Sequence, residues 1–114
     1  MTTVPNGLTI VNEVKGDRRS IVVRGELDLS TSGELADALE VAPEGGVRTV
    51  TLDLQGVGFI DSSALRTLVT CGRTLSAAGC ALEIGPRSDM VGRVLSMTSL
   101  DEENDAFRVL PVDA

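Results

Sequence analysis

The first part of the chain alternates apolar and polar residues in a way that predicts two antiparallel strands. In the segment LTIVNEV, the side chains of Leu8, Ile10 and Val14 would lie on one face of an extended backbone. The next residues, KGDR, are typical of a turn, and the β-branched stretch SIVVRGEL follows them. We therefore expect a β-hairpin at the start of the fold.

Three later segments carry apolar residues at helical spacing. They predict helices at about residues 31–41, between Asp61 and Gly79, and at 88–98. The apolar positions are, in order, Leu35, Ala38 and Leu39; Leu65, Leu68, Val69, Gly72 and Leu75; and Met90, Val91, Val94, Leu95 and Thr98. Residues able to cap these helices are Ser30, Thr31 and Ser32 before the first and Ser88 at the third.

Further strands are expected between and after the helices. VRTVTLDL at 47–54 alternates as a central strand does, CALEIG at 80–85 is shorter, and FRVLPV at 107–112 can add a last strand at a sheet edge. The acidic segment LDEENDA before it is expected to be a solvated turn or a fragment of helix. The order β, β, α, β, α, β, α, β predicts an α/β fold with a mixed sheet and right-handed crossovers. Runs such as IVV, which mark strands buried on both faces, are sparse, so we expect the helices mainly on one side.

Length and composition are consistent with one domain over residues 1–114. The chain has 114 residues, 42% of them apolar, and we find no internal repeat and no Pro-rich or Ser-rich linker. Its start, MTTVPNG, lacks the features of a secretory signal, and no apolar run is long enough to span a membrane. We expect a cytoplasmic protein without membrane insertion. The sequence predicts no particular oligomeric state.

Charge and side-chain chemistry exclude several functions. The net charge is -7, and neither a basic cluster nor a set of stacking aromatic residues is present, so direct binding of nucleic acid is not expected. The chain has no His, and Cys71 and Cys80 are isolated, so we expect no zinc site, two ordinary thiols and no disulfide. Asp28, Asp53 and Asp61 are separated by whole elements and do not predict a metal site. No cofactor is expected, because no phosphate-binding glycine motif is present.

Asp61, Ser62 and Ser63 stand where a strand meets the start of a helix, the place at which functional groups collect in α/β sheets. Three interpretations are open. The residues could form only a helix cap, which stabilises by ~1 kcal/mol, although one cap needs one residue and three are present. They could include a nucleophile, but a serine nucleophile needs a base and the chain has no His. They could present a hydroxyl for modification or contact, and no enzymatic activity is then expected.

A phosphate on Ser62 would affect binding more than folding. It would add a charge of about -1.5 to -2 beside Asp61. A helix N-terminus favours an anion by ~0.3 to 1 kcal/mol, so the fold should survive the modification. A partner that had closed over a neutral serine would instead have to desolvate a dianion.

The chain resembles the STAS domains of anti-sigma-factor antagonists, small bacterial proteins that release a sigma factor by capturing its anti-sigma kinase. The resemblance is carried by VVRGELDLSTSGELADAL, by VTLDLQGVGFIDSSALRTLV and more loosely by RVLSMTSLDEENDAFRV. It implies a four- or five-stranded sheet with helices on one side. It also implies that Ser62, the first serine after the acid, is phosphorylated by the partner, an anti-sigma serine kinase, and that only the unphosphorylated form binds that kinase.

The same resemblance implies a partner-binding surface around Ser62. Its expected members are Asp28, Ser30, Thr31, Asp61, Ser62, Ser63 and Ala64. Helical projection places Ser63 near the outward face and Ser62 at the edge of the buried stripe, so the choice of Ser62 as phosphoacceptor depends on the resemblance and not on periodicity.

Two residues depart from the family pattern. Ala64 and Ser99 each stand where such proteins commonly have Gly; we expect Ala64 to alter the fit of a kinase and Ser99 to change how the end of the third helix closes. The alternative function is a STAS interaction module without phosphoregulation, such as a scaffold or a subunit of a membrane-associated transport complex.

Overall fold

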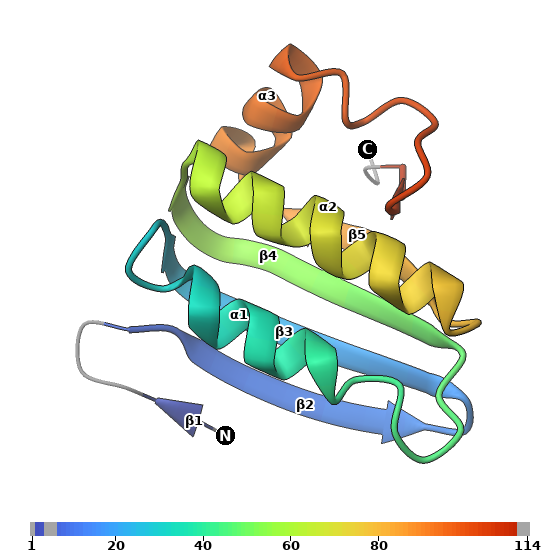
Figure 1. Cartoon of the computed structure of the whole chain (residues 1–114). Helices are drawn as coiled ribbons and strands as arrows, with labels where there is room; N and C mark the ends of the chain where they lie inside the picture. The colour runs from blue at the N-terminus through green and yellow to red at the C-terminus, as the bar shows by residue number, and fades with distance from the viewer. Residues whose placement is uncertain (1, 4–6, 112–114) are drawn as a thin grey trace.

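The computed structural model describes residues 2–3 and 7–111 and contains one mixed sheet with three helices (Figure 1). The six strands lie in the order β1-β2-β3-β4-β5-β6. Their bounds are β1 Thr2–Thr3, β2 Thr9–Lys15, β3 Arg18–Leu27, β4 Thr49–Ile60, β5 Ala81–Arg87 and β6 Arg108–Val109. The helices are α1 Ser32–Glu40, α2 Ser62–Ala77 and α3 Asp89–Met97. Apart from the two-residue strand β1, these are the elements that the sequence predicted.

Strands β2 and β3 form the expected antiparallel hairpin, with Lys15 opposite Arg18 at its turn. Leu8 and Ile10 are buried, as predicted. Val14 is not, because 47% of its surface is exposed. Val14 pairs with Arg19 next to the hairpin turn, beyond the buried part of the strand, so the prediction that its side chain is in the core is wrong.

Strands β3 to β6 are parallel and adjacent in sequence order, and a helix connects each to the next. A right-handed connection between neighbouring parallel strands fixes the side of the sheet on which its helix lies. Since the strands advance in one direction across the sheet, the helices pack mainly on one side. Figure 1 shows α1 and α2 side by side over that face.

Strand β4 is longer than predicted. It continues past Leu54 to Ile60, and the glycines in GVGF do not end it. Strand β3 offers a pairing partner as far as Leu27, and shifts in register between the two strands absorb the irregular stretch. Val57 and Ile60 are buried in consequence. Strand β5 also runs two residues further than expected, through Pro86 to Arg87.

The start of α3 and the end of α2 follow the sequence closely, whereas α1 begins after Thr31 without the side-chain cap expected from Ser30, Thr31 or Ser32. The Ser88 hydroxyl oxygen accepts a hydrogen bond from the Val91 N–H at 3.2 Å and caps α3, as predicted. At the end of α2, Gly79 adopts a φ of 79°. The N–H of Cys80 then donates to the Leu75 carbonyl at 2.9 Å, which is the Schellman ending that a glycine in this position favours.

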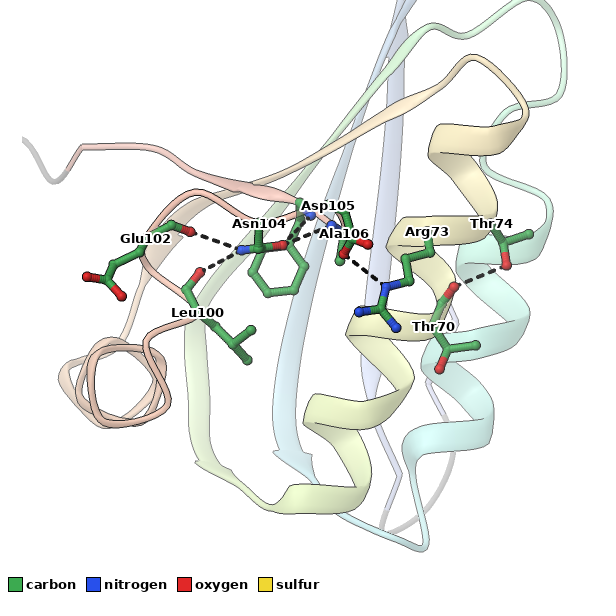
Figure 2. Close-up of polar contacts among 9 residues, drawn as sticks. Thr70, Arg73, Thr74, Leu100, Glu102, Asn104, Asp105 and Ala106 are labelled. Carbon is green, nitrogen blue, oxygen red and sulfur yellow. Dashed lines mark hydrogen bonds and ion pairs between the residues drawn. The ribbon is translucent and has the colours of Figure 1, made fainter.

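The segment between α3 and β6 is a turn and not a helix, and the side chain of Asn104 organises it (Figure 2). The Asn104 amide nitrogen donates to the carbonyl oxygens of Leu100 and Glu102, both at 3.1 Å. Its oxygen accepts from the N–H groups of Ala106 and Phe107 at 2.9 and 3.0 Å. These bonds fold the acidic segment back on itself. Strand β6 follows at the sheet edge, and Val112 of the predicted last strand lies outside the described residues.

The core lies between the sheet and the helices. Its largest fully buried side chains are Leu8, Ile21, Leu27, Leu35, Leu39, Leu52, Leu54, Leu68, Ile84 and Leu95. None of the helices in the described part of the chain has the length and apolar character needed to cross a membrane.

Candidate functional site

The site predicted from the sequence lies where β3 and β4 end. Because the two strands are parallel, their carboxyl ends meet at the same edge of the sheet, and Leu27 is in register with Ile60. The N–H of Asp61 donates to the Leu27 carbonyl at 3.0 Å and extends this pairing by one residue. We call this region, formed by residues 28–31 and 61–63, the carboxyl edge.

Asp61 joins the two halves of the carboxyl edge. One of its carboxylate oxygens, Oδ1, accepts from the Ala64 N–H at 3.0 Å and caps α2. The other, Oδ2, accepts from the Leu29 N–H at 3.2 Å in the loop between β3 and α1. A single carboxylate therefore begins one helix and holds the loop that precedes another.

Asp28 orders the loop before α1. Its Oδ1 atom accepts from both the hydroxyl and the N–H of Ser30, at 2.7 and 2.9 Å, and from the N–H of Thr31 at 3.2 Å. These bonds, the Ser30 hydroxyl bond above all, lower the pKa of Asp28 below its usual value, because they favour the ionised carboxylate. The Asp28 carboxylate therefore stays ionised to a lower pH than an ordinary aspartate does.

Thr31 is a structural residue of this loop and not a surface residue. Its side chain is 3% exposed, its hydroxyl donates to the Glu26 carbonyl at 2.7 Å, and it accepts from the Asp28 N–H at 3.0 Å. Of the two neighbouring hydroxyls predicted to face a partner, only that of Ser30 is exposed.

The two serines lie opposite to the prediction from helical projection. Ser62 is exposed as the first residue of α2, whereas Ser63 is half-buried. The projection used the stripe Leu65, Leu68, Val69, Gly72 and Leu75, but Leu65 and Val69 are only partly buried and the buried face includes Ala64. Including Ala64 turns Ser62 away from the core, so the hydroxyl chosen by resemblance is the more accessible of the two.

Ala64 belongs to the core. Its side chain is 0% exposed and packs in the main apolar cluster, so it does not lie on the surface where the sequence analysis placed it. A direct contact between its methyl group and a partner is ruled out in this conformation. Ala64 acts at the carboxyl edge through its backbone, whose N–H binds Asp61.

Sequence reasoning missed Leu29 as a member of the carboxyl edge. Its side chain is 77% exposed, although leucine is an apolar residue. A signal was available in LDLS, where an apolar residue stands among the polar residues of a predicted loop. Ser88 is a second residue that was not associated with this region: its hydroxyl donates to the Val57 carbonyl at 2.6 Å and fixes the start of α3 against β4.

The carboxyl edge has the chemistry of a recognition surface. Within residues 2–3 and 7–111, no three Cys, Asp or Glu side chains gather in a way that could hold a metal ion. A cavity of about 520 Å³ lies elsewhere, lined by the start of β5, by Ser76 and by residues 101–109. The carboxyl edge presents the exposed serines Ser30 and Ser62, the carboxylates of Asp28 and Asp61, and the exposed apolar side chain of Leu29.

Comparison with known proteins connects this arrangement to one family. The family model described as "Mlab, STAS domain" matches residues 12–111. An anti-sigma-B factor antagonist of Staphylococcus aureus (strain NCTC 8325 / PS 47) is 32% identical over 82 residues, which cover 72% of this chain and 76% of that protein.

Solved structures show the same fold. An anti-sigma factor antagonist from Mycobacterium paratuberculosis aligns with a TM-score of 0.78 at 22% identity, over 97% of this chain and 92% of its own. The anti-sigma factor antagonist SpoIIAA from Bacillus aligns in its unphosphorylated form with a TM-score of 0.70 at 20% identity, over 90% of this chain and 89% of its own. Its phosphorylated form aligns with a TM-score of 0.64 at 19% identity, over 90% and 92%.

Proposed function

The chain belongs to the STAS domain family, and from this membership we propose that it acts as a cytosolic anti-sigma factor antagonist switched by phosphorylation of Ser62. In this proposal the unphosphorylated protein binds an anti-sigma factor that is a serine kinase, and so releases a sigma factor for transcription. The kinase phosphorylates Ser62 and the complex then separates. The protein itself has no catalytic role.

One observation carries the proposal. Ser62 is an exposed hydroxyl at the first position of α2, directly after the carboxylate that caps this helix and binds the neighbouring loop. It occurs in a chain that is 32% identical to an anti-sigma-B factor antagonist. An exposed serine at a helix N-terminus is accessible to a kinase and tolerates the phosphate that the kinase adds.

The consequence of phosphorylation follows from charge. A phosphate adds about -1.5 to -2 beside Asp61, on a surface that also carries ionised Asp28. A kinase surface that fits the neutral serine has to desolvate this charge or lose contact. The two solved forms of SpoIIAA both retain the fold seen here, which supports an effect on binding and not on folding.

The proposal is tested with the anti-sigma serine kinases encoded in the source genome, each purified and mixed with this protein. We expect one of them, with ATP, to add a single phosphoryl group that intact-mass measurement detects, and the Ser62→Ala variant to remain unmodified. Ser63→Ala is the matched control, because its hydroxyl is adjacent but half-buried, and it should still be phosphorylated.

Binding measurements complete the test. Ser62→Ala should hold the kinase in the presence of ATP, whereas Ser62→Asp should bind it at least about tenfold more weakly, since a fixed charge stands at the contact. Equal affinity of the two variants would contradict the proposal.

A second candidate is a STAS interaction module without phosphoregulation, for example a scaffold or a subunit of a membrane-associated transport complex. It is favoured by the description of the matching family model, "Mlab, STAS domain", which names neither a sigma factor nor a kinase. Absence of phosphate after incubation with every candidate kinase and ATP would support this function over the first.

A further inference from the structure

An exposed leucine stands beside the candidate phosphoacceptor. The Leu29 side chain is 77% exposed, which makes it the most exposed of the large apolar residues in the described part of the chain. A single exposed leucine is common on protein surfaces and by itself indicates nothing. What distinguishes Leu29 is the way in which its backbone is held.

Hydrogen bonds fix the loop on both sides of Leu29. Its own N–H donates to Asp61 Oδ2 at 3.2 Å, across the carboxyl edge. Before it, the Asp28 carbonyl accepts from the N–H groups of Thr31 and Ser32, at 3.1 and 2.8 Å, and the Asp28 carboxylate accepts from Ser30. The backbone of the loop is therefore pre-organised, so binding costs little backbone ordering, and the loop presents an apolar side chain to solvent.

We propose that Leu29 is the apolar anchor with which the chain binds its anti-sigma kinase, and that Asp61 is the residue that positions it. The inference rests on the function proposed above and adds the chemistry of the contact. The partner surface is an apolar pocket that receives one leucine side chain, with basic groups at its rim facing Asp28 and Asp61.

The charges around Leu29 indicate this partner chemistry. Asp28 directly precedes the leucine in the sequence, and Asp61 binds the Leu29 N–H from the start of α2. Both are carboxylates, and the whole chain carries a net charge of -7. Interfaces place a buried apolar contact at the centre and complementary charge around it. The residue after Asp61 is Ser62, so a phosphate would stand at the rim of the same contact and oppose its charge complementarity.

Two other exposed apolar residues, Val41 and Phe59, are less suited to this role. Val41 stands at the C-terminal end of α1, and this helix runs from the carboxyl edge back toward the start of β4 (Figure 1). Phe59 precedes the buried Ile60 in β4, and successive strand residues point to opposite faces, so its side chain points away from the helices. Leu29 alone among these three lies in a loop that Asp61 binds.

The test uses whichever kinase binds the unmodified wild-type protein in the assay above, and it compares three variants by calorimetry. Leu29→Ser removes the apolar group and should weaken binding at least about tenfold, as expected for a central anchor. Leu29→Met keeps an apolar side chain of similar volume and should bind within about threefold of the wild type. Val41→Ser, a loss of exposed apolar surface distant from the carboxyl edge, should bind as the wild type does.

A double-mutant cycle tests the positioning role of Asp61. Asp61→Asn keeps one oxygen that can cap α2 but loses the second acceptor for the Leu29 N–H. If Asp61 acts through Leu29, Asp61→Asn should weaken binding in the wild-type background and have little further effect in Leu29→Ser. If Asp61 contributes independently of Leu29, through helix stability or through a direct charge contact with the partner, the losses will be equal in both backgrounds, and this would refute the positioning role.

The outcomes separate this inference from the proposed function. If the kinase binds the wild type and Leu29→Ser with equal affinity, the anchor is overturned while the proposed function stands. If no anti-sigma kinase binds the unmodified wild type, the proposed function fails and the anchor fails with it.

Discussion

Neighbouring residues at the carboxyl edge have separate tasks. Asp61 caps α2 and binds the loop before α1, Ser62 is exposed, and Ala64 is part of the core. The sequence motif DSSA identified the place, but not which of its side chains faces solvent. That depends on how the first turn of α2 packs, and the apolar spacing of Leu65 and Val69 indicated a slightly different buried face from the one observed.

Asp28 provides a prediction about pH. Its folded-state pKa lies below the ordinary value of 3.8, chiefly because of the Ser30 hydroxyl bond. A lowered folded pKa contributes stability above the unfolded pKa, and this contribution is lost as the pH falls through the folded pKa. An NMR titration should find the Asp28 carboxyl group titrating below 3.8, and Ser30→Ala should move its pKa upward. An Asp28 pKa unchanged by Ser30→Ala would contradict the hydrogen-bond assignment.

Ser99 provides a prediction about stability. Among the described residues, Ser99 is the one residue other than glycine that has a positive φ, which is 59°. It follows α3 in the position that Gly79 occupies after α2, and the Leu100 N–H donates to the Leu95 carbonyl at 2.9 Å. The helix therefore closes in the same Schellman form, and the expectation that Ser99 changes this closure is wrong.

The cost of Ser99 is conformational strain. Ser99→Gly should raise the free energy of unfolding by about 1 kcal/mol, because a side chain in the left-handed region is strained and glycine is not. Chemical denaturation measures the difference. A destabilised Ser99→Gly variant would show that the serine side chain contributes more than its backbone strain costs.

At the scale of elements, the regular patterns were informative and the irregular ones were not. The helix at 88–98 and the hairpin were found because their periodicity is complete and their caps are explicit. The extension of β4 through GVGF was missed because its pairing with β3 includes register shifts that no local pattern shows. Val14 was misplaced because strand alternation gives the face of a residue but not where along the strand the buried core ends.

The contact between α2 and the segment before β6 depends on one glycine. A Cβ atom on Gly72 would overlap with the Ala106 carbonyl oxygen, which belongs to the backbone and cannot rotate away as a side chain can. Figure 2 shows Ala106 held by Asn104, and Arg73 of α2 paired with Asp105 at 2.9 Å. The Asn104 hydrogen bonds and the Arg73–Asp105 ion pair thus hold the segment before β6 close to α2.

Two glycine substitutions in helices should have opposite effects. Gly72→Ala should lower the free energy of unfolding by ~1 to 3 kcal/mol, because overpacking outweighs the better helix propensity of alanine. Gly92→Ala in α3 is the matched control: its Cβ would meet only Arg87 Nε at 3.8 Å, so the same change should stabilise by ~0.5 to 1 kcal/mol. Thermal unfolding of both variants measures these changes. A stabilised Gly72→Ala variant would contradict the close contact between Gly72 and Ala106.

At the scale of the whole molecule, the groups that we propose for recognition lie at the edge of the sheet, outside the core. The phosphoacceptor that we propose is exposed at a helix N-terminus, and the buried side chains nearest to it in sequence are Ile60 and Ala64. The α/β class, the mixed sheet and the side of the helices could be predicted from the order of the elements. The way in which the Leu29 backbone is held could not, because it depends on a hydrogen bond between residues 32 positions apart.

The central claim is that phosphorylation of Ser62 controls binding and leaves the fold intact. The most direct measurement compares the unmodified protein with a homogeneous preparation carrying phosphoserine at position 62, for both thermal unfolding and affinity for the kinase that binds the unmodified form. We predict stabilities that differ by no more than ~1 kcal/mol, since the phosphate stands at a helix N-terminus, and an affinity reduced by at least about tenfold. Equal affinities of the two forms, or unfolding of the phosphorylated one, would contradict the claim.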